Sequence, residues 1–246
     1  MKKFKNEVNK HVKLNSMNEE LKNISRQFML VSTQPKYSYN FSWLGRPIIQ
    51  YPQDIVAMQE LIWEVKPDLI IETGIAHGGS LIFSASMLTL LEISGVIKSG
   101  MVLGIDIDIR EHNRVAIEKH PLTNKIKMIQ GSSIDEKIIS QVYNFTKDYN
   151  NILVVLDSNH THSHVIAELN AYAPLVSIGS YCVVFDTIIE DMPEDMFPDR
   201  PWGKDNNPKT AVREYLKTHP EFEINSSIEN KLLITVAPGG YLKRIK

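Results

Sequence analysis

Four acidic residues each follow a short apolar run that reads as a buried strand: Glu72, Asp106, Asp157 and Asp186. In an open parallel sheet, ligands bind outside the carboxyl ends of the strands, so all four side chains are expected at one edge. Asp157 and Asp186 lie on consecutive predicted strands. Two neighbouring carboxylates repel unless a cation neutralises them, and a hard divalent cation with oxygen ligands does so. The alternative is that each acid caps the next helix, which explains one such acid more easily than four.

Three histidines follow Asp157 at alternate positions: His160, His162 and His164. Three imidazoles could bind a transition metal, and a histidine near a carboxylate is also a natural general base. We take His160 as the candidate base and expect His162 and His164 to make helix-start contacts. An iron(II) facial triad needs His-x-Asp/Glu and a distant histidine. The match to that pattern is residues 219–221, in a predicted surface turn, so the sequence favours it weakly.

A glycine-rich turn, Glu72-Thr-Gly-Ile-Ala-His-Gly-Gly-Ser80, joins the first of these strands to an apolar helix at 81–91. Glycines let the backbone approach a ligand closely, and a helix N-terminus offers free N–H groups. The spacing differs from the Gly-x-Gly-x-x-Gly dinucleotide fingerprint. Either this is an ordinary strand-to-helix turn, or it binds a cofactor through Glu72, Thr73, Gly74, Gly78 and Ser80.

Two further positions suit a nucleoside. Asp106 ends the second strand of the unit, where an acid commonly binds ribose hydroxyls through both carboxylate oxygens. Asp108 is the weaker candidate for that role. The segment 131–135 contains small hydroxyl residues, among them Ser132, which could line an adenine slot or cap the next helix.

These residues must be positioned by alternating strands and helices. The apolar runs predict strands at 69–71, 101–108, 126–130, 151–156 and 181–185, and an antiparallel pair at 222–228 and 231–236. Helical periodicity predicts helices at 53–65, 81–91, 110–120, 135–149, 165–173 and 210–218. The alternation predicts an α/β, Rossmann-like fold: a mostly parallel sheet with an antiparallel C-terminal strand and helices on both faces.

Two segments outside the regular alternation, 1–35 and 188–208, suggest how the chain is organised. Apolar residues recur at helical spacing through the polar, lysine-rich segment 1–35. We therefore expect residues 1–50 to form a helical and irregular extension, acting as a lid or an oligomer contact, and residues 51–246 to form the main domain. The long segment 188–208 contains Arg200 and Trp202, and loops of that length in compact domains are usually functional or disordered.

Bulk properties exclude several classes of function. A formal net charge of -2 leaves no electrostatic footprint for nucleic acid. No run approaches the ~20 apolar residues of a membrane span. The single cysteine, Cys182, excludes an intrachain disulfide and fits the cytoplasm. It lies in an apolar run, which indicates a buried structural thiol.

Several segments occur in order between about Tyr39 and the C-terminus: Pro47–Asp54, Ile71–Ser80, Gly104–Arg110, Leu156–Val165, Arg200–Gly203, Asn207–Val212 and Asn230–Arg244. Together they resemble the cephalosporin hydroxylase/rhamnosyl O-methyltransferase family. The resemblance implies a Rossmann-like, S-adenosylmethionine-dependent O-methyltransferase with a magnesium (Mg²⁺) site. By motif position, Asp157 and Asp186 would be magnesium ligands with Thr187 beside them, and Asp157 would also border the cofactor.

The resemblance extends to individual roles and to two departures. Glu72 would lie near the methionine end of the cofactor, and His160 occupies the place of a basic residue in catechol-type O-methyltransferases. This chain has Phe185 where an acid is expected before Asp186, which removes one carboxylate ligand. It also has His77 where arginine is more usual.

We therefore expect methyl transfer to a hydroxyl of a sugar or glycosylated natural product, that is, a small-molecule or glycan acceptor. The segment with Arg200 and Trp202 would close over this acceptor, with the Trp202 ring stacking on a sugar. A homo-oligomer is expected as well. Two alternatives stay open: a hydroxylase-type iron oxygenase, and a cofactor-binding accessory protein that has lost catalysis, as Phe185 would suggest.

Overall fold

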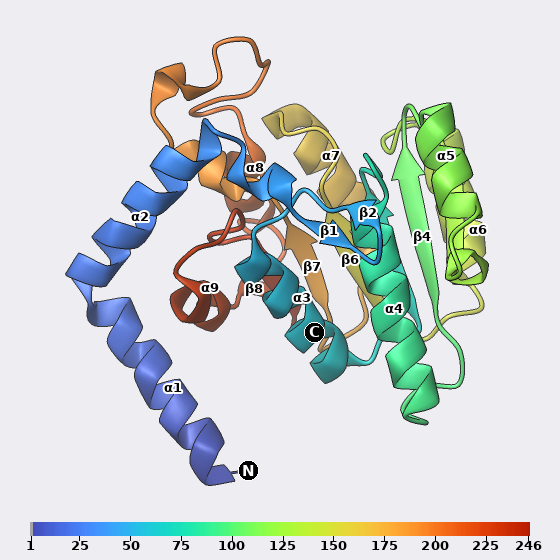
Figure 1. The fold of residues 1–246 in the computed structure, drawn as a ribbon, viewed down its shortest axis with the longest axis horizontal. Coiled ribbons are helices and arrows are strands. Elements are labelled where there is room, and N and C mark those ends of the chain that lie inside the picture. Colours follow the sequence, from blue (N-terminus) through green and yellow to red (C-terminus); the bar gives the residue numbers. More distant parts are fainter. Residues whose placement is uncertain (1) are drawn as a thin grey trace.

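The computed structural model describes residues 2–246, which form a seven-stranded sheet and a small hairpin. The strand order of the large sheet is β5-β4-β3-β6-β7-β9-β8, and β9 and β8 run antiparallel at one edge (Figure 1). Its strands are β3 (Leu69–Thr73), β4 (Met101–Asp106), β5 (Ile126–Gln130), β6 (Ile152–Leu156), β7 (Tyr181–Val184), β8 (Phe222–Ile224) and β9 (Tyr241–Arg244). The expected mostly parallel Rossmann-like sheet is confirmed.

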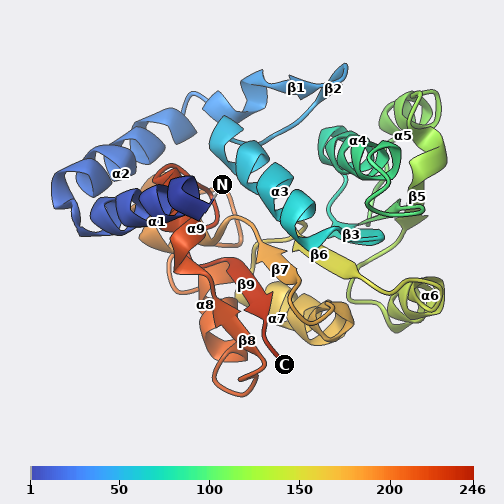
Figure 2. The ribbon, with the colours of Figure 1, turned by 90° about the horizontal axis from the view of Figure 1, so that it is seen from below.

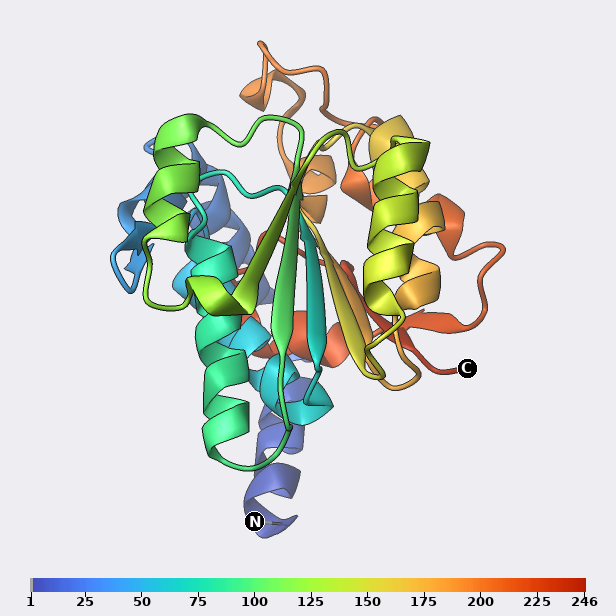
Figure 3. The same ribbon diagram turned by 90° about the vertical axis from the view of Figure 1, so that its right-hand side faces the viewer.

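Helices cover both faces of this sheet, as Figures 2 and 3 show. On one face lie α3 (Pro52–Val65), α4 (Gly79–Ile93) and α5 (Glu111–Glu118), and on the other lie α6 (Glu136–Thr146), α7 (His162–Tyr172) and α8 (Pro208–Tyr215). All six overlap the helices expected from periodicity. No helix in the described part of the chain is long and apolar enough to cross a membrane.

The core explains why the apolar runs became central strands. Every residue of β3 and of β6 is buried, as expected for parallel strands covered on both faces. Leu81 and Leu88 of α4 pack on one face of the sheet. Val142 of α6 and Leu169 of α7 pack on the other face. The two layers hold the carboxyl ends of the strands at one level.

The N-terminal segment forms two helices, as expected, and they extend from the main body as a bent arm (Figure 1). These are α1 (Lys2–Met17), which lies beside α9, and α2 (Glu19–Thr33), whose N-cap Asn18 accepts a hydrogen bond from the Leu21 amide. Met29 of α2 packs with Tyr51 and Met192 in a small apolar cluster. The hairpin of β1 (Ser42–Trp43) and β2 (Arg46–Pro47) then leads to α3. A domain boundary at residue 50 stays a prediction.

One expectation about the C-terminal region is wrong. Residues 231–236 are not a strand, and the strand expected at 222–228 ends at Ile224. Helix α9 (Ser226–Leu232) begins there, where the Asn225 side chain accepts from the Ser227 amide. The antiparallel partner of β8 is β9, which begins at Tyr241 and not at the expected residue 231. The apolar residues at 231–236 suggested a strand, but the end of this run makes hydrogen bonds to other segments. The Val236 amide donates to Asp54, and the Ile188 amide donates to the Val236 carbonyl.

Candidate active site

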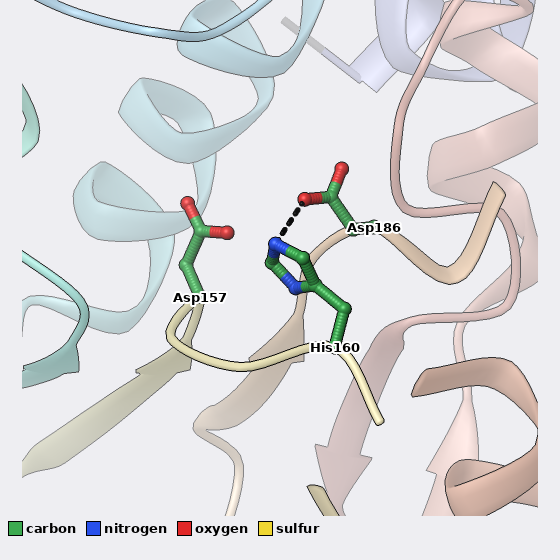
Figure 4. Close-up of side chains that lie close together, drawn as sticks. All are labelled: Asp157, His160 and Asp186. Carbon is green, nitrogen blue, oxygen red and sulfur yellow. Dashed lines mark ion pairs between the residues drawn. The ribbon is translucent and has the colours of Figure 1, made fainter. Parts of the chain in front are cut away.

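Three side chains from two neighbouring strand ends meet at the centre of the sheet's carboxyl edge (Figure 4). Asp157 and His160 follow β6, and Asp186 follows β7. One ligand atom from each residue lies within 4.8 Å of the other two. His160 Nε2 is 3.1 Å from Asp186 Oδ2. The structure thus brings together the predicted base and both predicted metal ligands.

Strand register places these side chains at one height. Thr73 pairs with Leu156, and Leu156 pairs with Val184, so Gly74, Asp157 and residue 185 leave the sheet at the same level. A Cβ on Gly74, which has φ +91°, would lie 2.0 Å from the Asp157 carbonyl oxygen. Gly74 is therefore required for the approach of the two loops, a role that needs no ligand.

The backbone at Asp186 is held in an unusual conformation. Its φ is 55°, in the left-handed region, where non-glycine residues are uncommon and often functional. The next residue, Thr187, is fully buried, and its hydroxyl donates to the Pro238 carbonyl at 2.9 Å. Thr187 thereby anchors the backbone that carries Asp186, and its role as a metal ligand stays a prediction.

The electrostatics of Asp157 fit a bound cation. Burial raises the pKa of its carboxyl well above the usual value, and the charges of Asp186, Glu72, Glu168 and Asp54 raise it further. None of these influences favours the carboxylate form. A divalent cation between Asp157 and Asp186 would remove the repulsion and supply the missing partner.

The helix-cap alternative fits poorly. The N-cap of α7 is Thr161 rather than Asp157, and Asp186 makes no side-chain capping hydrogen bond to the 3-10 helix η4 (Thr187–Asp191) that follows it. Phe185, at the position where an acid is usual, is 2% exposed and packs in the core. The cluster therefore has two carboxylates and one imidazole.

Trp202 lies against one member of this cluster, His160. Its ring is nearly perpendicular to the His160 imidazole, at a centroid distance of 4.8 Å, and the Arg200 guanidinium lies 5.2 Å from the Trp202 ring. The segment between η4 and α8 therefore does reach back to the candidate site. Asn207 ends the segment and caps α8 through a capping box, so the chain re-enters regular structure at a defined point.

The other two histidines of the run point elsewhere. His162 Nδ1 lies 2.8 Å from the Thr210 hydroxyl and Nε2 lies 3.2 Å from Glu214, which ties α7 to α8. His164 Nε2 lies 3.1 Å from Ser133 Oγ and 3.4 Å from Glu168 Oε1. These are the helix-start and packing contacts expected from the sequence. His219, of the weak iron motif, stacks on Tyr215 and lies outside the cluster.

The candidate cofactor side of the edge begins at Glu72. This residue is 3% exposed, its carboxylate accepts from Ser80 Oγ, and burial raises its pKa to about 7. Thr73 is also buried, and its hydroxyl has no hydrogen-bond partner among the described residues. A buried carboxylate without a cationic neighbour fits the sulfonium and ammonium charges of S-adenosylmethionine.

The glycine turn is braced by Asp106. Its Oδ2 accepts from the amides of Ile75 (2.8 Å) and Ala76 (3.3 Å), and its Oδ1 accepts from the backbone amide of Asp108 (2.9 Å). Asp106 thus orders the turn in addition to any contact with ribose, which stays a prediction. Gly78 lies close to the Ile117 side chain. A Cβ at position 78 would lie 2.4 Å from that side chain, so the contact needs glycine.

A small cavity links the turn to the cluster. Its volume is about 50 Å³, and Gly74, Ser80 and Asp157 line it together with the segment Pro47–Gln50. Ser132 lies in the loop after β5 without a side-chain contact to this cavity. That loop's hydroxyls do not cap α6, since Asp135 accepts from the Lys137 amide instead. An adenine contact by Ser132 stays a prediction.

Sequence reasoning missed two supports of the site. Arg46 Nη2 donates to the His77 carbonyl (2.6 Å) and to Asn113 Oδ1 (2.9 Å), so a guanidinium from β2 holds the glycine turn. Asp54 is fully buried in α3 and accepts from the Val236 amide and the Tyr241 hydroxyl, and burial raises its pKa to about 6. An acid on the buried face of a predicted helix was the available signal for Asp54.

The raised pKa of Glu72 has a consequence for stability. Its usual value is 4.5, so the folded protein binds a proton that the unfolded chain has lost, and the free energy of unfolding should fall as pH rises from about 4.5 to about 7. The full cost, ~3 kcal/mol at most, is present above that range. We expect Glu72→Gln to be more stable than wild type at pH 8 and equal to it near pH 4. Urea unfolding at both values measures this, and an equal offset at both would contradict it.

Comparison with known proteins identifies the family of this chain. The family model described as Rhamnosyl O-methyltransferase/CmcI matches residues 35–245. A rhamnosyl O-methyltransferase of Mycobacterium tuberculosis is 30% identical over 194 residues, which cover 78% of this chain and 73% of that protein. A rhamnosyl O-methyltransferase of Mycobacterium leprae is 29% identical over 205 residues, 82% of each chain.

Solved structures confirm the fold. A CmcI structure with magnesium and S-adenosylmethionine aligns with a TM-score of 0.57 at 20% identity, covering 85% of this chain and 78% of that one. An O-methyltransferase from Bacillus cereus in complex with S-adenosylhomocysteine aligns with a TM-score of 0.51 at 15% identity, covering 84% and 82%. With the family match, these findings mean that the chain belongs to the rhamnosyl O-methyltransferase/CmcI family, as its sequence motifs implied.

Proposed function

We propose that this protein is an S-adenosylmethionine- and magnesium-dependent O-methyltransferase that acts on a hydroxyl of a sugar or natural-product acceptor. One observation carries the proposal: Asp157, His160 and Asp186 converge at the strand ends beside the glycine turn, in a chain of this family. The named relatives methylate rhamnosyl groups, and a CmcI structure binds magnesium and S-adenosylmethionine, which supports both the reaction and the cofactors.

The protein's own residues divide the work of the reaction. Glu72 and the glycine turn would bind the cationic end of the cofactor, and Asp157 with Asp186 would hold the divalent cation. When bound, that cation supplies Lewis acidity that lowers the pKa of an acceptor hydroxyl. Methyl transfer also needs the oxygen aligned with the sulfonium methyl, and the fixed strand ends provide this alignment.

His160 would accept the proton of the acceptor hydroxyl. Its Nε2 lies 3.1 Å from Asp186, so the carboxylate would stabilise the positive charge that the imidazole gains. Trp202 closes one side of the imidazole and would exclude water from the proton transfer. The neighbouring Arg200 guanidinium also contacts the Trp202 ring.

Phe185 supports one rival function, a cofactor-binding accessory protein without catalysis, because it leaves the cluster with two carboxylates. A transfer assay separates the two. The purified protein is incubated with methyl-labelled S-adenosylmethionine and a panel of rhamnosides and other glycosides, with magnesium or with a chelator. We expect label in a glycoside only when magnesium is present. Full transfer after exhaustive chelation would overturn the metal role. In a parallel incubation with iron and an oxoacid, hydroxylation of a glycoside would indicate an oxygenase.

We further propose a homo-oligomer in the cytoplasm. Large apolar side chains are exposed along the arm, including Phe4, Met17, Ile24 and Val31, each more than half exposed. Exposed apolar side chains along both helices of the arm support a contact between copies. Cys182 is a free, buried thiol, in keeping with a reducing compartment. Light scattering coupled to size exclusion tests the assembly, and a monomer at high concentration would contradict it.

A further inference from the structure

A second, larger cavity lies between α2 and the C-terminal part of the main domain. Its volume is about 560 Å³, which is in the usual range for small-ligand pockets. Met29 of α2 lies on one side, and Ile188 of η4 and Leu233 after α9 lie on the other. The cavity therefore exists because the arm folds against the main domain.

The position of this cavity suits the acceptor. In the sheet order, the candidate cofactor residues follow β3 and β4, the cluster follows β6 and β7, and the cavity lies beyond β7, toward β9 and β8. In-line transfer needs the acceptor on the side of the methyl group away from sulfur. Helix η4 connects the two places, since it begins directly after Asp186 and its Ile188 and Asp191 line the cavity.

Basic side chains define the chemistry of the cavity. Lys22 and Arg26 project from one face of α2, one turn apart, and both interact with Glu19, at 2.6 Å and 3.7 Å. The Glu19 side chain is 68% exposed, and exposed ion pairs contribute little and rearrange readily. Lys209 also lines the cavity and pairs with Asp191 at 2.5 Å. Two cations on α2 are thus available to an incoming anion.

The remaining acid of the cavity is Glu229. Burial raises its pKa, while its carboxylate accepts a hydrogen bond from the Gly239 amide. It faces the cavity from α9 and is already partnered, as Asp191 is by Lys209. The lining itself therefore carries three cations, Lys22, Arg26 and Lys209, against these two carboxylates. An anion that enters would replace the exposed Glu19 as the partner of the two cations on α2.

We propose that this cavity binds an anionic group, a phosphate or a carboxylate, on the acceptor sugar at a distance from the methylated hydroxyl. The proposal rests on the methyltransferase function above and adds the charge class of the substrate. Residues 35–245 carry the family match, whereas Lys22 and Arg26 lie outside it. The arm would therefore give this chain an acceptor preference of its own.

The test measures binding without turnover. Calorimetric titrations of the full chain with S-adenosylhomocysteine present, and without divalent cation, use glucose 1-phosphate, glucuronate and uncharged glucose as probes. We expect one or both charged sugars to bind more tightly than glucose. The double variant Lys22→Gln/Arg26→Gln should weaken that binding about tenfold or more, the order for losing a charge-assisted hydrogen bond. The control Lys10→Gln/Lys13→Gln, on the exposed surface of α1, should bind as wild type does.

A second pair of variants tests the location. Ile224 lines the cavity from edge strand β8 and is 41% exposed, so it tolerates substitution. Ile224→Glu adds a negative charge and should weaken binding of the charged sugars, whereas Ile224→Gln should not. Equal binding of glucose and charged sugars, or unchanged binding in the double variant, would overturn the proposal. If S-adenosylhomocysteine still binds in that case, the methyltransferase function itself is unaffected.

Discussion

Asp157→Asn is expected to abolish magnesium binding and to lower methyl transfer on the order of a thousandfold or more, because the cation loses an anionic ligand and the acceptor loses a Lewis acid worth several kcal/mol. The same change should raise the Tm of the metal-free protein. Wild-type Asp157 is destabilised by burial and by four neighbouring carboxylates, and the neutral amide removes that repulsion. Calorimetric magnesium titration and thermal unfolding without metal measure the two effects.

Two companion variants make this result specific. Asp186→Asn should also abolish the magnesium heat and leave cofactor affinity largely intact. Asp108→Asn changes an exposed acid near the glycine turn and should leave the magnesium heat unchanged. If Asp157→Asn binds magnesium as wild type does, the cluster is not the metal site.

His160→Ala is expected to lower turnover by ~10²–10⁴-fold, the usual cost of removing a general base, with little change in cofactor affinity. The imidazole lies between the two carboxylates and against Trp202, so it is the described histidine that faces the site. Wild-type turnover should rise with pH through one ionisation, since a base must be unprotonated to act. The variant should lose that step. Initial rates across pH, with saturating S-adenosylmethionine and magnesium, measure it.

The same histidine run supplies the controls. His162→Ala breaks the contacts to Thr210 and Glu214, and His164→Ala breaks those to Ser133 and Glu168, so both should affect stability more than chemistry. An inactive His162→Ala or His164→Ala beside a fully active His160→Ala would mean that the base is misassigned. Loss of bound metal in all three variants would mean that the histidines themselves are the metal site.

The sequence predicts the candidate site well where backbone geometry dictates it. Parallel strands end at one edge, so an acid directly after a buried apolar run must appear there, and Asp157 and Asp186 do. The spacing of His160 from Asp157 keeps it on the same loop. The Trp202 contact was expected only as part of a loop that closes over the site.

Tertiary contacts between distant segments limit what the sequence predicts. Asp54 bonds to residues about 180 positions later, and Arg46 reaches the His77 carbonyl, which no local pattern specifies. The pattern of residues 222–236 also suggested two strands. Instead, the Asn225 side chain caps helix α9, and the Val236 amide donates to Asp54 rather than to a neighbouring strand. The cavity beneath α2 also depends on how the arm packs, which the amphipathic pattern alone does not fix.

The measurement that tests the central claim most directly is a calorimetric titration of S-adenosylmethionine into the wild-type protein, with and without magnesium, followed by magnesium into the cofactor complex. We predict saturable cofactor binding in both conditions and a magnesium heat that Asp157→Asn abolishes, as expected for a cofactor site beside a two-carboxylate metal site. Cofactor binding with no magnesium heat in wild type would contradict the metal-dependent enzyme and indicate an inactive accessory protein. Absence of cofactor binding altogether would contradict the methyltransferase function itself.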